Sequence, residues 1–239
     1  MDKVKTALAP RKIVIAIDGP AGSGKSTLAA LLAKKYHYIN IETGAMYRAL
    51  ALKAMQCDVS LEDGPVLLAL AGESRIELQP RPEGNRVLLD GADITERIRQ
   101  QDVTDGASKV SVHPPVREWM VDRQREMGVG GGVVMEGRDI GTRVFPDAEV
   151  KIFLDAEPEV RGSRRFLQNP EVETSHKASL EELHRRDHRD RTRANSPLVP
   201  APDAVLIDST HLTLEQVTKQ AIAVIERALA EQLALETEK

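Results

Sequence analysis

Short apolar runs alternate with helical patterns along most of this chain. Five runs are rich in β-branched residues and lack strict polar–apolar alternation: Ile13–Ile17, Tyr38–Ile41, Val133–Met135, Val150–Leu154 and Ala204–Ile207. Between them, apolar residues recur every three or four positions over Ser26–Lys35, Ala45–Met55 and Pro115–Met127. Continuous apolar strands are typical of a parallel sheet that is buried on both faces. The pattern therefore predicts an α/β fold with a doubly wound parallel sheet, followed by an amphipathic helix after Glu215.

One stretch in the first half of the chain interrupts this alternation. Arg75–Leu78 alternates polar and apolar residues, Pro80–Asn85 is rich in turn formers, and Arg86–Leu89 is again partly apolar. This order predicts a small antiparallel β unit with one solvated face, inserted into the main fold at about residues 73–101.

Composition narrows the functional classes. The net charge of the 239 residues is −4 and only 3% of them are aromatic. These values argue against a general nucleic-acid or membrane-surface binder and against a platform that stacks bases. The single cysteine, Cys57, excludes an internal disulfide, and we expect it to be a buried structural residue of a cytoplasmic protein. Without repeats or heptads, a monomer is the default expectation.

A glycine-rich loop follows the first predicted strand. Residues Gly19–Ser26 read G-P-A-G-S-G-K-S and match G-x-x-x-x-G-K-[ST], with the required strand before the loop and helix after it. The glycines let backbone N–H groups close around phosphate oxygens, and the helix directs the positive end of its dipole toward them. Lys25 would reach the β- and γ-phosphates of ATP, and the Ser26 hydroxyl would bind Mg²⁺. The predicted ATP site consists of Gly19, Pro20, Ala21, Gly22, Ser23, Gly24, Lys25, Ser26 and Thr27.

This loop alone does not distinguish a kinase from an ATPase, a GTPase or a motor. A guanine-nucleotide switch is disfavoured, because no N-K-x-D motif occurs in the chain. The choice among the remaining classes depends on the other charged segments.

Two polar segments, Glu42–Arg48 and Glu136–Thr142, directly follow predicted strands. In an open parallel sheet, ligands bind beyond the carboxyl ends of the strands. Thr43 would cap the next helix and Arg48 would pair with a phosphate, or the segment is an ordinary capped helix with an exposed arginine. The second segment offers an arginine and two carboxylates to a phosphoryl acceptor, or else it is a turn with a local ion pair.

The most basic segment spans residues 185–193, with five arginines and two aspartates. Acid–base pairs four residues apart would suit a solvated helix: Glu181–Arg185, Glu182–Arg186 and Asp187–Arg191. Alternatively, one helix face gathers Arg186, Arg189, Asp190 and Arg193. Several guanidinium groups on one face call for an anion, such as the phosphates of two nucleotides. Residues 161–193 would then form a lid that closes over the phosphates.

Together these motifs resemble those of the bacterial cytidylate kinases. The resemblance is collinear, covers nearly the whole chain and includes the β-rich insert. It rests on Gly19–Thr27, Thr43–Arg48 (T-G-A-M-Y-R), Glu136–Pro146 (E-G-R-D-I-G-T-x-V-F-P), Lys151–Ala156 (K-I-F-L-D-A), Arg186–Arg193 (R-D-x-x-D-x-x-R) and Ser196–Ala204 (S-P-L-V-P-A-P-D-A).

This resemblance implies the P-loop NTPase fold in a single nucleoside monophosphate kinase domain. Its sheet would have five parallel strands in the order 2-3-1-4-5, flanked by helices. The core would comprise residues 11–72, 102–160 and 194–239, with an acceptor-binding insert at about 73–101 and a helical lid at about 161–193.

The resemblance also implies that ATP, with Mg²⁺, phosphorylates CMP and dCMP, with no nucleic-acid or membrane partner. The implied catalytic residues are Lys25, Arg138, Arg186 and Arg191. The acceptor nucleotide would meet Thr43, Tyr47, Arg48, Ser108, Arg117, Arg138, Asp139, Arg186, Asp190 and Arg193. Among these, Ser108 and Arg117 match the positions that read the cytosine base.

From the residues alone, two other functions stay open. One is a kinase of the same fold that acts on AMP, UMP or a non-nucleotide alcohol. The other is a non-catalytic ATP-binding switch that uses its arginine helix to bind a partner. Acceptor-dependent formation of ADP distinguishes the switch from any kinase.

Overall fold

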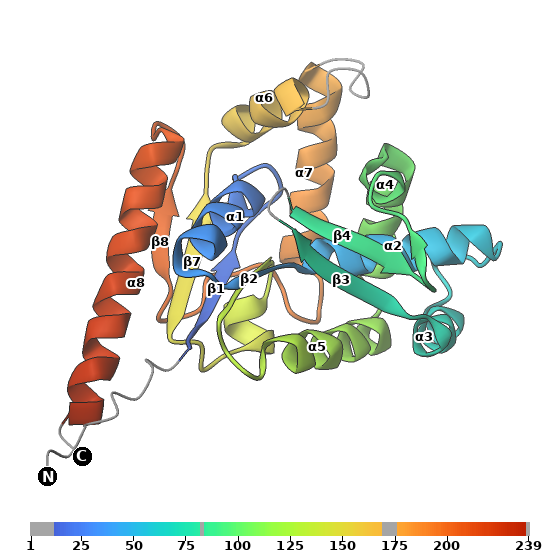
Figure 1. Ribbon diagram of the computed structural model, residues 1–239. Helices are drawn as coiled ribbons and strands as arrows, with labels where there is room; N and C mark the ends of the chain where they lie inside the picture. Colours follow the sequence, from blue (N-terminus) through green and yellow to red (C-terminus); the bar gives the residue numbers. More distant parts are fainter. Residues whose placement is uncertain (1–11, 82–83, 169–175, 238–239) are drawn as a thin grey trace, which may run out of the picture.

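The computed structural model describes residues 12–81, 84–168 and 176–237 (Figure 1). Its main sheet has five parallel strands: β1 (Val14–Asp18), β2 (Ile39–Glu42), β6 (Val133–Gly137), β7 (Val150–Asp155) and β8 (Val205–Asp208). Their order across the sheet is β2-β6-β1-β7-β8, which is 2-3-1-4-5 when these strands are numbered along the chain. The predicted fold class and strand order are therefore confirmed.

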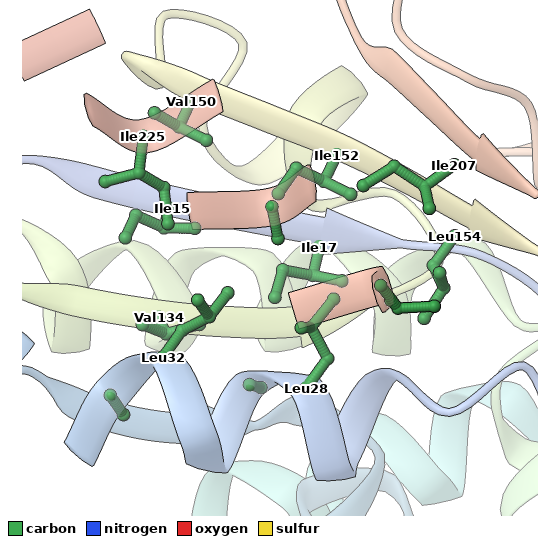
Figure 2. Close-up of a cluster of buried hydrophobic side chains, with 14 of the residues drawn as sticks. Ile15, Ile17, Leu28, Leu32, Val134, Val150, Ile152, Leu154, Ile207 and Ile225 are labelled. Carbon is green, nitrogen blue, oxygen red and sulfur yellow. The ribbon is translucent and has the colours of Figure 1, made fainter. Parts of the chain in front are cut away.

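Both faces of the sheet are buried. Alternate residues of β1 point to opposite sides of the sheet, and all five residues of the strand are buried. Ile15 and Ile17 pack with side chains of α1 (Lys25–Tyr36) and α8 (Leu214–Thr237), as Figure 2 shows for this cluster. On the other face, the neighbouring side chains of β1 pack with residues of α5 (Pro114–Gly128) and of the π-helical turn η2 (Ile140–Val144). This double burial is the physical reason for the uninterrupted apolar run of the first strand.

Further helices enlarge the structure beside β2. They are α2 (Thr43–Gln56), α3 (Gly64–Glu73) and α4 (Gln101–Val110), which share a buried cluster with α5. Helices α2 and α5 were predicted from the sequence, whereas α3 and α4 were not. For α3 the signals are present, since the Asp63 side chain accepts a hydrogen bond from Val66 N and a proline stands in the first turn.

The predicted insert forms a three-stranded antiparallel sheet, with β3 (Ile76–Arg81), β4 (Gly84–Leu89) and β5 (Ala92–Asp93). Residues Pro80–Asn85 were predicted as a turn, but β3 continues through Pro80 to Arg81 and β4 already begins at Gly84. A proline is tolerated there because β3 is an edge strand of this sheet. Side chains of β4 pack against α2, so the insert rests on the helix that follows β2.

The charged segment forms two helices, α6 (Pro158–Gln168) and α7 (His176–Thr192), which pack against each other. In Figure 1 they lie beyond the carboxyl ends of β1 and β7. The amphipathic tail pattern is confirmed by α8, which covers the face of the sheet that α1 also covers.

Two observations concern the molecular surface. Cys57 lies at the carboxyl end of α2 and is exposed, so the prediction that it is buried is wrong. In the part of the chain that the structure describes, no helix combines the length and the apolar character needed to cross a membrane.

Candidate active site

An acidic residue lies at or next to the carboxyl end of every strand in the main sheet. These residues are Asp18, Glu42, Glu136, Asp155 and Asp208. Glu42 and Glu136 are register partners on neighbouring strands. Burial and the Glu42 carboxylate raise the pKa of Glu136. The predicted glycine-rich loop and both predicted polar segments start from this edge.

The glycine-rich loop connects β1 directly to α1. Gly19 has a φ of 149°, and a Cβ atom there would lie 2.0 Å from the Leu154 carbonyl oxygen, so only glycine fits. Gly24 has a φ of 97° and precedes the first residue of α1. The helix N-terminus therefore opens toward the loop, as phosphate binding requires.

Lys25 and Ser26 begin α1 at the mouth of this loop. Lys25 Nζ donates to the Pro20 carbonyl oxygen at 2.6 Å, and Ser26 Oγ donates to Glu136 Oε1 at 2.5 Å. Burial, followed by the positive charge of Arg138, lowers the pKa of Lys25 to about 7. The structure thus brings the predicted lysine and serine together with Glu136, one of the two carboxylates that the sequence places at this edge without indicating which of them serves a metal ion.

Asp18 organises the segment after β6. Its two carboxylate oxygens accept hydrogen bonds from the backbone N–H groups of Ile140 and Gly141, at 2.8 and 2.7 Å. Burial raises the pKa of Asp18 to about 6, although these two donors oppose the rise. Asp18 was not predicted as a site residue, because its partners lie more than a hundred residues away along the chain.

The start of α2 differs from the prediction in one respect. Thr43 does not cap the helix, because Glu42 occupies the cap position and the Thr43 hydroxyl donates to the Glu136 carbonyl oxygen at 2.8 Å. The side chain of Arg48 turns back and forms an ion pair with Glu42. Both residues lie at the ligand edge, and Arg48 already has a carboxylate partner there.

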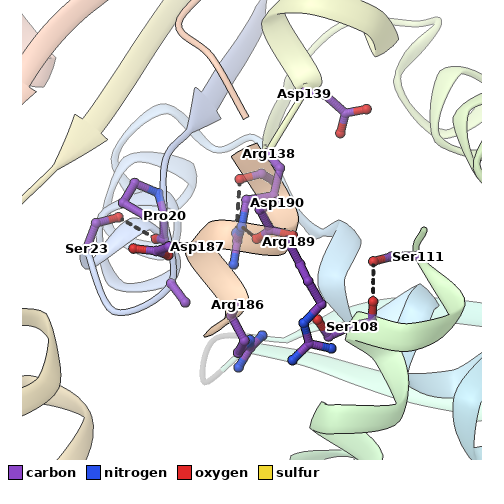
Figure 3. Close-up of polar contacts among 12 residues, drawn as sticks. Pro20, Ser23, Ser108, Ser111, Arg138, Asp139, Arg186, Asp187, Arg189 and Asp190 are labelled. Carbon is purple, nitrogen blue, oxygen red and sulfur yellow. Dashed lines mark hydrogen bonds and ion pairs between the residues drawn. The ribbon is translucent and has the colours of Figure 1, made fainter. Parts of the chain in front are cut away.

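Arg117 is the centre of a second buried group. It donates to Asp139 Oδ2 at 2.5 Å and to the Ser111 carbonyl oxygen at 3.1 Å, and its guanidinium lies 5.5 Å from the centroid of the Tyr47 ring. Ser108 joins this group indirectly, because the Ser111 hydroxyl donates to the Ser108 carbonyl oxygen (Figure 3). Helices α2, α4 and α5 therefore converge on Asp139 at the end of β6.

The face of α7 that carries the arginines meets the same edge. Arg138 Nε donates to Asp190 Oδ2 at 2.9 Å, and Arg193 lies 3.6 Å from Asp190 and 4.0 Å from Asp139 (Figure 3 shows the Arg138–Asp190 pair). Burial alone would raise the pKa of Asp190, but the charges of the surrounding arginines lower it. For Arg186, burial together with Arg138 and a second arginine lowers the pKa to about 10.

Arg191 differs from these residues. Its guanidinium lies 3.7 Å from Asp155 and its side chain is 52% exposed. Of the three acid–base pairs that the solvated-helix interpretation required, only Glu182–Arg186 is within ion-pair distance, at 3.8 Å. Asp187 instead pairs with Arg161, so the helix is not a simple solvated one.

Arg161 is a buried residue that the sequence analysis included in the lid without giving it a function. It lies in the first turn of α6, donates to the Ala21 carbonyl oxygen of the glycine-rich loop at 3.0 Å, and lies 2.7 Å from Asp187 of α7. Its side chain is only 2% exposed. Two long-range contacts determine this position, and a single sequence gives no signal for either.

Comparison with known proteins decides the family. The family model described as cytidylate kinase matches residues 15–227 of this chain. The chain belongs to the cytidylate kinase family. The matched range includes the antiparallel insert and both helices α6 and α7.

Curated relatives agree with this assignment. The cytidylate kinase of Geobacillus thermodenitrificans is 50% identical over 219 residues, which cover 90% of this chain and 97% of that protein. The cytidylate kinase of Enterococcus faecalis is 52% identical over 208 residues, covering 86% and 92%. The cytidylate kinase of Pasteurella multocida is 43% identical over 220 residues, covering 91% and 97%.

Proposed function

We propose that this chain transfers the γ-phosphoryl group of ATP to CMP and dCMP, forming CDP and dCDP for pyrimidine nucleotide metabolism. One observation carries the proposal. The glycine-rich loop with Lys25 and the buried group around Arg117 and Asp139 adjoin the same edge of one sheet, with Arg138 and Asp190 beside them. Membership of the cytidylate kinase family supports this reaction.

The residues at this edge suit an in-line transfer. A phosphate oxygen of the acceptor attacks the γ-phosphorus, the bond to the β–γ bridging oxygen breaks, and ADP leaves with that electron pair. Lys25, Arg138 and Arg186 would stabilise the negative charge of the migrating group. Asp190 fixes the orientation of Arg138, so this positive charge is in place before the reaction starts.

Ser26 and Glu136 would hold the Mg²⁺ ion. A hydroxyl and a carboxylate 2.5 Å apart are the oxygen ligands that this cation prefers. The described residues contain no group of three or more His, Cys, Asp or Glu side chains that could hold a metal ion. Phosphate oxygens and water would therefore complete its coordination. Once bound, the ion would neutralise charge on the β- and γ-phosphates.

Ser108 and Arg117 would read the cytosine base. The Ser108 hydroxyl and Arg117 Nε are buried, and neither has a hydrogen-bond partner among the described residues. Cytosine presents acceptors on its ring nitrogen and carbonyl, which suit a hydroxyl and a guanidinium N–H as donors. Tyr47 and Asp139 hold Arg117 from two sides, so its orientation is fixed.

We further propose that residues 73–101 act as the acceptor insert and residues 161–193 as the lid of a single domain, in a monomeric cytoplasmic enzyme. The packing of β4 on α2 supports the first role, because α2 carries Thr43, Tyr47 and Arg48. The contacts of Arg161 with the glycine-rich loop support the second.

The test is the release of ADP from ATP and Mg²⁺ in the presence of CMP, dCMP, UMP, AMP or no acceptor. Fast release with CMP and dCMP alone is expected. Release with AMP or UMP at the same rate would overturn the base assignment but leave the phosphoryl transfer. If folded protein binds ATP without acceptor-dependent release, the chain is an ATP-binding switch instead.

A further inference from the structure

A residue of the predicted lid directly contacts α4, the helix that carries Ser108. Arg165, on α6, donates from Nη2 to the side-chain oxygen of Gln101, the first residue of α4, at 2.8 Å. The same nitrogen donates to Glu182 Oε1 of α7 at 3.2 Å. Gln101 is held in turn, because its amide nitrogen donates to Asp105 at 3.0 Å. One guanidinium group therefore joins three helices.

The partners of Arg165 on both sides lie close to residues of the proposed active site. Glu182 Oε1, which Arg165 contacts, also lies 3.8 Å from Arg186 Nη1. Gln101 and Ser108 are seven residues apart on α4, which places them on the same face of the helix. In Figure 3 the part of α7 that carries Arg186 lies between the glycine-rich loop and the Ser108 end of α4.

The chain of contacts is well shielded from water. The side chains of Arg165, Glu182 and Arg186 are 15%, 10% and 14% exposed. In such surroundings a hydrogen bond to a charged group is stronger and more directional than on an open surface. The contact between the lid and α4 is therefore expected to be specific in its geometry, unlike an exposed surface contact.

We propose that Gln101 is a positioning residue for phosphoryl transfer, acting through Arg165 and Glu182 on Arg186. It links the helix that carries Ser108 to the lid arginine, so that Arg186 is held over the migrating phosphoryl group when the lid lies against α4. This inference rests on the proposed kinase function.

The kinetic test is a double-mutant cycle of Gln101→Leu, Arg165→Gln and the double variant. Gln101→Leu is expected to lower kcat about tenfold, the effect of losing one hydrogen bond to a charged group, with little change in the KM for ATP. Because both residues act through one contact, the double variant should be no slower than Arg165→Gln alone. Asp102→Asn is the matched control, since Asp102 neighbours Gln101 on α4 and its exposed ion pair is with Arg97, which precedes this helix.

A second measurement follows the lid without relying on turnover. Spin labels at His184→Cys and Arg99→Cys, both at exposed positions, report the distance between α7 and the insert in a Cys57→Ser background. Gln101→Leu should move part of the population to longer distances, and Asp102→Asn should not. Equal kcat and equal distances in the Gln101→Leu and Asp102→Asn proteins would overturn the proposal. A chain without acceptor-dependent activity but with the label shift would instead contradict only the proposed function.

Discussion

The Ser26 hydroxyl and the Glu136 carboxylate meet at 2.5 Å, which joins the first turn of α1 to the end of β6. Replacing Glu136 with Gln removes the negative charge but keeps the shape of the side chain. We expect the variant to need about 10–100 times more Mg²⁺ for half-maximal rate, the usual cost of disturbing a metal's supporting carboxylate. A titration of the rate with Mg²⁺ measures this. If the Mg²⁺ concentration for half-maximal rate is unchanged, Glu136 does not help to hold the metal ion.

Lys25→Ala tests the phosphate loop. The lysine is buried and held by the Pro20 carbonyl oxygen, so its ammonium group has a fixed position. Its loss should lower kcat by at least about a hundredfold, as expected when one donor to a developing anion is removed. Thermal unfolding of the variant is the control for folding. A folded variant with near-normal kcat would contradict the role of Lys25.

The pH dependence of the rate reports the protonation state of Lys25. Burial and the charge of Arg138 lower the pKa of Lys25 to about 7, so its positive charge is lost in the free protein as the pH rises through this value. Accordingly, kcat/KM for ATP should fall above about pH 7, because this ratio reports ionisations of the free enzyme. Bound phosphates favour the charged form, so kcat should persist to higher pH. A kcat/KM that stays constant from pH 7 to 9 would contradict this expectation.

Arg186 and Arg191 form a matched pair on α7. Arg186 is shielded beside Arg138, whereas the side chain of Arg191 is half exposed and faces Asp155. Arg186→Ala should lower kcat by about a hundredfold with a smaller change in ATP affinity. For Arg191→Ala we expect less than about a fivefold loss, because exposed ion pairs contribute little. Steady-state kinetics and ATP binding measure both, and a larger loss for Arg191→Ala would assign the catalytic role to that residue instead.

The main sheet could be predicted from the sequence because its strands are buried on both faces. All five residues of β1 are buried, and a continuous apolar run is the direct result. The short helix α3 was not predicted, although Asp63 as the N-cap and Pro65 in the first turn are typical signals of a helix start. The extent of β3 was misjudged because a proline normally ends a strand, and only its edge position allows it here.

The candidate site was predictable where one local motif carries the chemistry. The glycine-rich loop and its lysine are of this kind, because backbone geometry and charge are determined within a few residues. Asp18 and Arg161 were not predictable, since their partners at Gly141 and Asp187 are distant in sequence. Thr43 was given a local capping role, but tertiary packing directs its hydroxyl to the neighbouring strand.

Product analysis with ATP labelled by ¹⁸O in its γ-phosphoryl group tests the central claim most directly. In-line transfer to the acceptor predicts that, with CMP present, the label appears in the new terminal phosphate of CDP and that no labelled inorganic phosphate accumulates. The Lys25→Ala protein, under the same conditions, should form almost no labelled CDP. Label found in inorganic phosphate instead of CDP would mean that the protein hydrolyses ATP, and it would contradict the account of this chain as a cytidylate-phosphorylating enzyme.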